Sequence, residues 1–270
     1  MSPTISTSMA ARDVSGQVVQ IRINRYDAEY DSSLDAAMLD ALVGQIEKFW
    51  KPKLDLGALI ERDADLNWDW RGQVLTPAFT EVGTLEPRGG TLLVLESERD
   101  PHQPEAVARV IYDWKTRHLP RQTKQRGRPP VKPLAAYVDT LAVAPWNRAE
   151  APPPARVREL GRLLLFGAIL LSHENGHGGR IALHAAPLAE SWYQAALPGA
   201  KFEYDRQEIG DLQDASGNHA PYVEVDDSVA WTYCTNTLAS IQDARGIASV
   251  VNGNVVNTLA RLGMNLQGLP

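Results

Sequence analysis

The sequence is poor in cysteine, with Cys234 as the single one among 270 residues. One cysteine excludes an internal disulfide and suits a protein of a reducing compartment. Long apolar runs are also missing, since no stretch reaches the roughly 18 residues that a membrane-spanning helix needs. The N-terminus lacks the basic start and apolar stretch of a secretion signal. We therefore expect a cytoplasmic protein without membrane contact, in which residues 1–16 form a flexible leader.

Positive charge is in deficit along the chain as a whole. The 27 lysines and arginines face 33 aspartates and glutamates, which gives a formal net charge of −6. This balance argues against a general nucleic-acid-binding protein. A hydrophobic content of 44% with 22% charged residues is ordinary for a globular protein. We expect one domain over residues 17–232, followed by a C-terminal extension over residues 233–270.

One segment departs from this acidic average. No acidic residue lies between Trp114 and Leu134, and Pro129, Pro130 and Pro133 oppose a helix or a central strand. Its basic residues are Lys115, Arg117, Arg121, Lys124, Arg126, Arg128 and Lys132. Two interpretations stay open, a solvated hairpin loop or an electrostatic guide for an anionic substrate or for cofactor phosphates.

Regular patterns in the first half of the chain predict strands and one helix. Val19, Ile21 and Ile23 alternate with polar residues, which is the period of a half-buried strand. Apolar residues spaced by four predict an amphipathic helix over residues 33–50. Apolar runs at 91–95 and 106–114 predict two more strands, joined by a turn-rich link.

The clearest succession of elements runs from Tyr137 to Tyr193. It predicts a strand, a proline-rich loop, an apolar helix, a short strand and a last helix that carries Trp192 and Tyr193. The central helix should end at Asn175-Gly176, because this pair and the two following glycines are typical of a helix terminus. Two further strands are expected over 200–204 and 219–225.

This order resembles the acyl-CoA-binding core of the GNAT family of N-acetyltransferases. In that family a strand is followed by a loop of the form R/Q-x-x-G-x-G/A that begins the central helix. Taking Arg156 as the first position places Glu159 at the first glycine and Gly161 at the last. Taking Arg158 instead places Gly161 first and Leu163 last. We prefer the first alignment, because the apolar side chains then fall where the family's helix is apolar.

The resemblance implies a mixed α/β (α+β) fold, with a mostly antiparallel sheet that splays at its centre and helices on both faces. It implies transfer of an acetyl group from acetyl-CoA to an amine of a small-molecule or protein acceptor. Unpaired N–H groups and the dipole of a first helical turn can hold a pyrophosphate there. The cofactor-binding residues that it implies are Leu141, Ala142, Val143, Arg156, Val157, Arg158, Glu159, Leu160, Gly161 and Arg162.

The resemblance also implies catalytic roles for three side chains. Acyl transfer needs a deprotonated amine and a proton donor for the leaving thiolate. Tyr193 matches the family's tyrosine that acts as general acid, since a phenol is protonated at neutral pH. His184 and Glu224, at strand ends, are the candidate general bases.

Two alternatives belong to other functional classes. The stretch His173-Glu174-Asn175-Gly176-His177 satisfies the zinc-peptidase pattern H-E-x-x-H, but the expected helix end places the second histidine off the required face. We therefore expect no metal site. The other alternative is a protein of the same fold that binds acyl-CoA or a partner with little turnover, because Glu159 brings a carboxylate to the phosphate loop.

Overall fold

The chain forms an eight-stranded, mostly antiparallel open sheet with helices. The computed structural model describes residues 5–13, 15–28, 43–50, 90–97, 103–120, 130–147, 157–186, 189–204 and 221–245. Its strands are β1 (Ile5–Arg12), β2 (Val18–Ala28), β3 (Gly90–Ser97), β4 (Pro104–Lys115), β5 (Leu134–Val143), β6 (Ile181–His184), β7 (Lys201–Glu203) and β8 (Tyr222–Val225). Its named helices are the 3-10 turn η2 (Pro145–Asn147), α3 (Leu160–Glu174), α4 (Glu190–Ala196) and α5 (Asp227–Arg245).

The strand order in the sheet is β1-β2-β3-β4-β5-β6-β8-β7. Neighbours β1–β2, β2–β3, β6–β8 and β7–β8 pair in antiparallel fashion. The β5–β6 pair is parallel, with α3 as the connection between its strands. Its register runs from Ala136↔Ile181 to Val138↔Leu183, whereas β5 itself continues to Val143.

The chain divides into two compact units. The expectation of one domain over residues 17–232 stays a prediction. Unit 1 contains residues 1–109, 140–167 and 237–270, and unit 2 contains residues 110–139 and 168–236. The boundaries fall inside β4, β5, α3 and α5, where no change of composition marks them. Each unit is therefore described by itself.

Both ends of the expected domain differ from the prediction. Residues 5–12 of the expected leader form β1, which pairs with β2 from Ile5↔Arg25 to Arg12↔Val18. Strand pairing uses backbone groups, so the small and polar side chains of β1 do not prevent it. At the other end α5 runs through the expected boundary at residue 233. Asp226 starts this helix by accepting the Val229 N–H at 2.9 Å.

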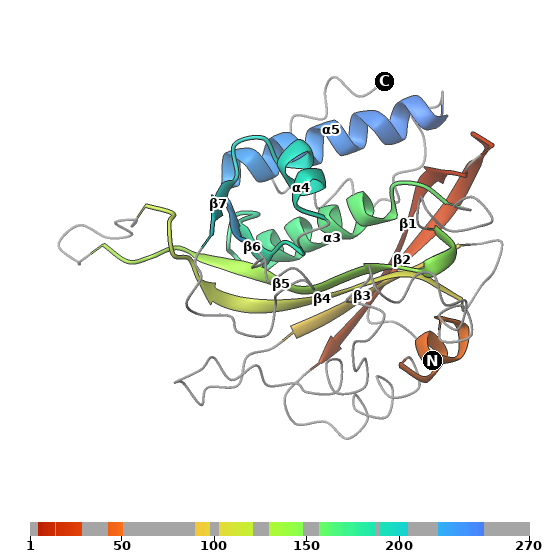
Figure 1. Cartoon of the computed structure of the whole chain (residues 1–270), viewed down its shortest axis with the longest axis horizontal. Helices are drawn as coiled ribbons and strands as arrows, with labels where there is room; N and C mark the ends of the chain where they lie inside the picture. The colour runs from red at the N-terminus through yellow and green to blue at the C-terminus, as the bar shows by residue number, and fades with distance from the viewer. Residues whose placement is uncertain are drawn as a thin grey trace. The chain divides into compact units, whose positions relative to one another are not determined.

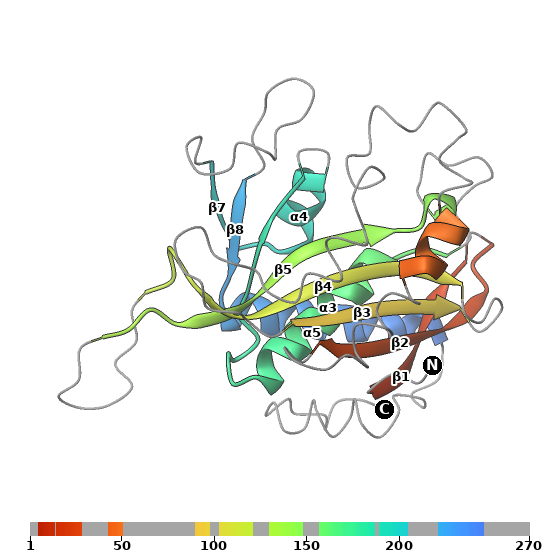
Figure 2. The ribbon, with the colours of Figure 1, turned by 90° about the horizontal axis from the view of Figure 1, so that it is seen from below.

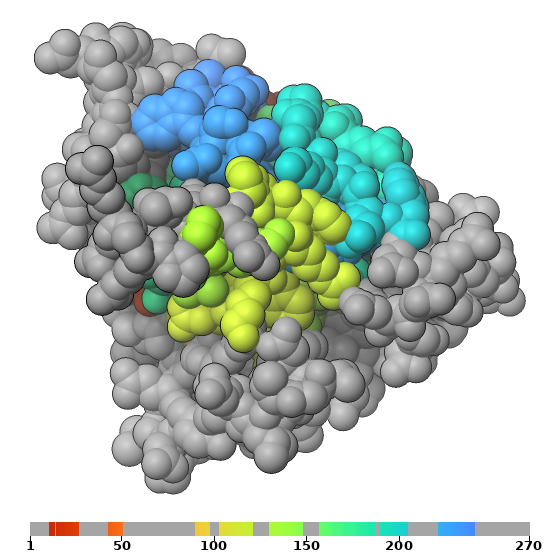
Figure 3. Space-filling view, turned by 90° about the vertical axis from the view of Figure 1, so that its left-hand side faces the viewer, coloured from red at the N-terminus to blue at the C-terminus, as the bar shows by residue number. Residues whose placement is uncertain are grey.

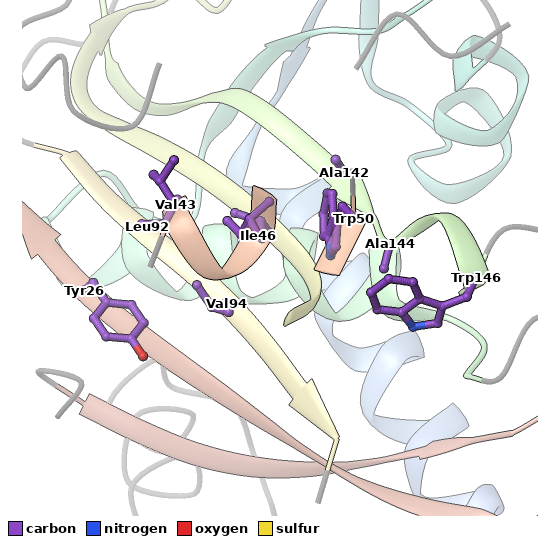
Figure 4. Close-up of a cluster of buried hydrophobic side chains, with 10 residues drawn as sticks. Tyr26, Val43, Ile46, Trp50, Leu92, Val94, Ala142, Ala144 and Trp146 are labelled. Carbon is purple, nitrogen blue, oxygen red and sulfur yellow. The ribbon is translucent and has the colours of Figure 1, made fainter. Parts of the chain in front are cut away.

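Unit 1 has an apolar core between its strands and the helical residues 43–50. Figure 4 shows this cluster, in which Ile46 and Trp50 lie over side chains of β3 and β5. The Trp50 indole N–H also donates to the Pro104 carbonyl at 2.9 Å. These residues are the C-terminal part of the helix predicted over 33–50, and the remainder of that prediction lies outside the described residues. Strands β1, β2 and β3 lie side by side in this unit (Figure 1).

Unit 2 contains the β6–β8–β7 part of the sheet, and β7 and β8 run side by side in Figure 2. The period of two in β8 sends Val223 and Val225 to one face and Tyr222 and Glu224 to the other. Cys234 of α5 is buried, and burial raises the pKa of its thiol to about 12. Among the described residues, none of the helices combines the length and the apolar character that crossing a membrane requires.

Candidate functional site

In unit 1 a buried carboxylate fastens the connection between β5 and α3. Glu105 is 1% exposed and accepts hydrogen bonds from the indole N–H of Trp146 at 2.6 Å and from the side-chain amide of Asn147. The side-chain oxygen Oδ1 of Asn147 in turn accepts a hydrogen bond from the Val157 backbone N–H at 2.9 Å. The segment that leads into α3 is thereby held at both ends by side-chain contacts.

The start of α3 is where the sequence predicted a phosphate-binding loop. Glu159 has a φ of 65°, a left-handed conformation that favours glycine. Its carboxylate is nearly half exposed and contacts the Arg162 guanidinium at 3.2 Å and the Ser240 hydroxyl at 3.5 Å. The Arg158 N–H already donates to the Arg12 carbonyl at 2.8 Å. Arg156, the first residue of the preferred alignment, lies outside the described residues.

The first turn of α3 follows Glu159 directly. Its first backbone hydrogen bond of the helical type runs from the Leu163 N–H to the Glu159 carbonyl at 3.1 Å. The N–H groups of the residues before Leu163 therefore precede the helical ladder, as at any helix start. The other predicted cofactor residues are the end of β5, where Leu141 and Val143 are partly exposed and Ala142 belongs to the core.

In unit 2 the polar face of the sheet collects ionisable and aromatic side chains. The register aligns Tyr137, Ala182 and Glu224 in one cross-strand row. His184 and Tyr222 form the next row on the same face, with ring centroids 5.1 Å apart. The structure thus brings two of the three predicted catalytic residues, His184 and Glu224, to one face of this unit.

Glu224 is a fully buried carboxylate with four donors. It accepts the backbone N–H groups of Arg117, His118 at 2.8 Å and Leu119 at 2.9 Å. It also accepts the Tyr222 hydroxyl at 2.8 Å. Since both oxygens are engaged, these contacts suit an anchor for the turn after β4 better than the predicted general base.

His184 has one ring nitrogen bonded and one without a contact. Its Nδ1 lies 2.5 Å from the Tyr137 hydroxyl. Its Nε2 is buried and has no hydrogen-bond partner among the described residues. Burial first, and then the Arg117 charge, lowers the pKa of His184 from 6.5 to about 4. The ring is therefore neutral at pH 7 and is a weak proton acceptor.

Aromatic rings fix the partners of His184. Tyr137 stacks on Trp114 with centroids 4.2 Å apart, and the Trp114 indole N–H donates to the Tyr222 hydroxyl at 3.0 Å. The Arg117 guanidinium lies 4.3 Å from the Tyr222 ring centroid. Burial is the main cause that raises the pKa of both Tyr137 and Tyr222 above the ordinary tyrosine value. Both phenols therefore keep their protons at neutral pH.

Tyr193, the predicted general acid, lies on α4. It is 6% exposed and its ring meets Trp192 edge to face at 4.9 Å. Burial raises its pKa above the ordinary tyrosine value, which keeps the hydroxyl protonated. The general-acid role remains a prediction, since the same burial that keeps the hydroxyl protonated makes it a weaker acid.

The described part of the basic segment is a turn that hydrogen bonds from two lysines hold in place. The Lys132 ammonium donates to the carbonyls of Arg117 and Leu119, and Lys201 of β7 donates to the His118 carbonyl at 3.2 Å. His118 Nε2 lies 2.6 Å from a Glu203 oxygen. Figure 3 shows the segment after β4, in yellow-green, near the α4–β7 region, in cyan. Residues 121–129, which carry Arg121, Lys124, Arg126 and Arg128, lie outside the described residues.

The H-E-x-x-H stretch is broken as the glycines predicted. Helix α3 ends at Glu174, and Gly176 has a φ of 76°. His177 is 4% exposed and its Nε2 lies 3.3 Å from an Asp113 carboxylate oxygen. No group of three or more metal-ligating side chains occurs among the described residues.

Sequence reasoning missed Tyr137, Tyr222 and Glu105. Tyr222 could have been found, because it lies two residues from Glu224 on the same strand face and directly across from His184. Tyr137 pairs with Ala182 and carried no such signal. Glu105 carried no such signal, since its partners lie 41 and 42 residues away in sequence. In comparisons with protein-family models and with curated proteins, the chain has no significant match in either.

Proposed function

We propose that the chain transfers an acyl group, with acetyl as the first candidate, from coenzyme A to an amine. The observation that carries this proposal is the β5–α3–β6 arrangement, two parallel strands joined by one helix. Their pairing ends at Val138, although β5 continues to Val143. In the GNAT enzymes, which this order resembles, such a strand end offers backbone groups to the ligand, and the resemblance implies this role for Leu141 to Val143.

The beginning of α3 supports binding of the coenzyme A diphosphate. The φ of 65° at Glu159 is the conformation that a glycine would take there, which favours the alignment with Arg156 first. Donors at the first helical turn attract an anion, and the guanidinium groups of Arg158 and Arg162 add charge-assisted hydrogen bonds. The fastening of Val157 by Asn147 orders this turn before a ligand arrives.

The protonation states of the side chains support a general acid in the protein but no general base. Tyr193 is the proposed general acid for the thiolate because its hydroxyl is protonated at neutral pH, although the pKa that burial raises makes it a weaker acid than a free tyrosine. Glu224 is engaged by four donors, and His184 with a pKa of about 4 is a poor base for an amine. The amine therefore reacts in its neutral form and loses its proton to water.

A second candidate function is acyl-CoA binding with little turnover. The observation that favours it is the Glu159 carboxylate, which stands at a glycine position of the phosphate loop and faces Arg162. A carboxylate there repels phosphate and competes for the same guanidinium. The two candidates differ in turnover and agree on the ligand.

The test is release of free thiol from acetyl-CoA across a panel of amines. We expect release with at least one amine, and Tyr193→Phe should lower kcat about 100-fold or more with acetyl-CoA affinity nearly unchanged. Trp192→Phe, at the exposed neighbouring position, is the matched control and should keep turnover. Equal turnover of Tyr193→Phe and the control would remove the acid assignment. Binding of acetyl-CoA without thiol release would favour the second candidate, and neither binding nor release would overturn the proposal.

A further inference from the structure

The buried Nε2 of His184 has no explanation in the packing of unit 2. Every other buried side-chain nitrogen or oxygen of the described residues has a hydrogen-bond partner. A buried polar atom left without a partner costs about 1–3 kcal/mol. Such an atom at the end of β6, on the sheet face that carries Tyr137 and Tyr222, is therefore a candidate contact for a ligand.

The contact with Tyr137 bears on which ring nitrogen of His184 carries the hydrogen. Burial keeps the Tyr137 hydroxyl protonated, and the lone pair of a neutral imidazole is a good acceptor. The Tyr137 hydroxyl lies 2.5 Å from Nδ1, and it is the donor of this hydrogen bond when the ring hydrogen sits on Nε2. A neutral ring that accepts at Nδ1 carries its own hydrogen at Nε2. The stacking of Tyr137 on Trp114 holds the phenol in this position.

We infer that the Nε2–H of His184 donates a hydrogen bond to the acyl carbonyl oxygen of the bound thioester, with Tyr137 as the positioning residue that fixes the tautomer. The inference rests on the proposed acyl transfer. A single uncharged donor suits a carbonyl oxygen, since it attracts the negative charge that this oxygen gains during attack. An ammonium group would be repelled by this N–H and by the nearby Arg117.

The step balances without a proton leaving His184. The amine nitrogen attacks the thioester carbon, a C–N bond forms, and the carbonyl electron pair moves onto the oxygen that His184 contacts. The oxyanion then reforms the carbonyl, the C–S bond breaks, and the thiolate takes a proton from Tyr193. The nitrogen's surplus proton goes to water, which restores Tyr193 by exchange. The products are an amide and free coenzyme A.

The direct test is a ¹H–¹⁵N spectrum of the histidine rings in the wild-type chain. The spectrum of His184→Gln identifies the His184 signals among the six histidines. We expect the Nε2–H tautomer, and a shift of the Nε2 signal on adding acetyl-CoA that coenzyme A without an acyl group does not produce. An Nδ1–H tautomer, or equal shifts with the two ligands, would overturn the inference.

Variants supply the kinetic test. His184→Ala removes the donor and should lower kcat roughly 100- to 1000-fold, with the KM for acetyl-CoA changed much less. His184→Gln retains an N–H near the Nε2 position and should recover part of the loss. Tyr137→Phe removes the group that fixes the tautomer, and its kcat should lie between those of the wild type and His184→Ala. His173→Gln, on α3, is the control for loss of a histidine, and melting temperatures identify any variant that fails to fold.

The outcomes separate this inference from the proposed function. Acetyl-CoA binding and thiol release that persist unchanged in His184→Ala would overturn the inference and leave the acyl-transfer proposal standing. Absence of acetyl-CoA binding by the wild-type chain would remove both. A shift specific to acetyl-CoA together with rescue by glutamine supports both.

Discussion

Each unit buries one glutamate that fastens a loop, and the two differ in where their donors come from. Glu105 in unit 1 is bonded by side chains of Trp146 and Asn147. Glu224 in unit 2 is bonded mainly by backbone N–H groups of residues 117–119. The hydrogen bonds of Glu105 depend on which side chains stand at positions 146 and 147. Those of Glu224 depend mainly on the backbone conformation of residues 117–119.

This difference shows how two loops beside a proposed site can be ordered by different means. In unit 1 a change at Trp146 or Asn147 can loosen the start of α3 while Glu105 stays in place. In unit 2 the turn can vary in sequence as long as Glu224 remains, because every non-proline residue offers an N–H. We therefore expect substitutions of the two glutamates to differ in size.

The largest effect is expected for Glu224→Leu. It leaves three backbone donors and the Tyr222 hydroxyl without their acceptor, which should lower the free energy of unfolding by about 4 kcal/mol. Urea denaturation measures this loss. The control is Glu203→Leu on β7, whose partly exposed carboxylate contacts His118 of the same turn and should change stability by about 0.5 kcal/mol. A loss for Glu224→Leu no greater than that of the control would contradict the anchor role.

A smaller loss is expected for Glu105→Leu. Two side-chain donors lose their acceptor there, which should cost about 2–3 kcal/mol by the same measurement. The variant should also weaken acetyl-CoA binding, because Asn147 no longer holds Val157 before α3. Glu47→Leu, a partly exposed position of the same unit, is the matched control. Unchanged coenzyme affinity in a stable Glu105→Leu variant would separate this fastener from the proposed site.

A third prediction concerns the pH dependence of stability in unit 2, which contains all histidines among the described residues. The folded-state pKa of His184 is about 4 against 6.5 in the unfolded chain. Between these values the unfolded chain binds a proton that the folded chain does not, so stability falls as pH falls from 6.5 to 4. The loss should reach roughly 2 kcal/mol after allowing for partial exposure of the ring. Denaturation of wild type and His184→Gln across this range measures it, and parallel curves would contradict the assignment.

The sequence predicted the positions of helices and strands better than the contacts between residues far apart in the chain. The alternation in residues 222–225 predicted β8, and Asn175-Gly176 predicted the end of α3. The strand β1 escaped because its small and polar residues show no period of two. Contacts such as those of Glu224 with the turn at 117–119 span 105 to 107 residues, and no local pattern encodes a contact of that separation. The alignment of Glu159 with a glycine stays a prediction, and Glu159 itself has a φ of 65°, which no local pattern indicated.

The proposition on which the acyl-transfer account depends is that this chain binds a coenzyme A thioester. Calorimetric titration of the purified wild-type chain with acetyl-CoA tests it most directly. The account predicts saturable binding of one equivalent, weakened by added salt because the diphosphate is held by charge. A titration without binding heat at several temperatures, together with no protection of the chain against thermal unfolding by acetyl-CoA, would contradict it.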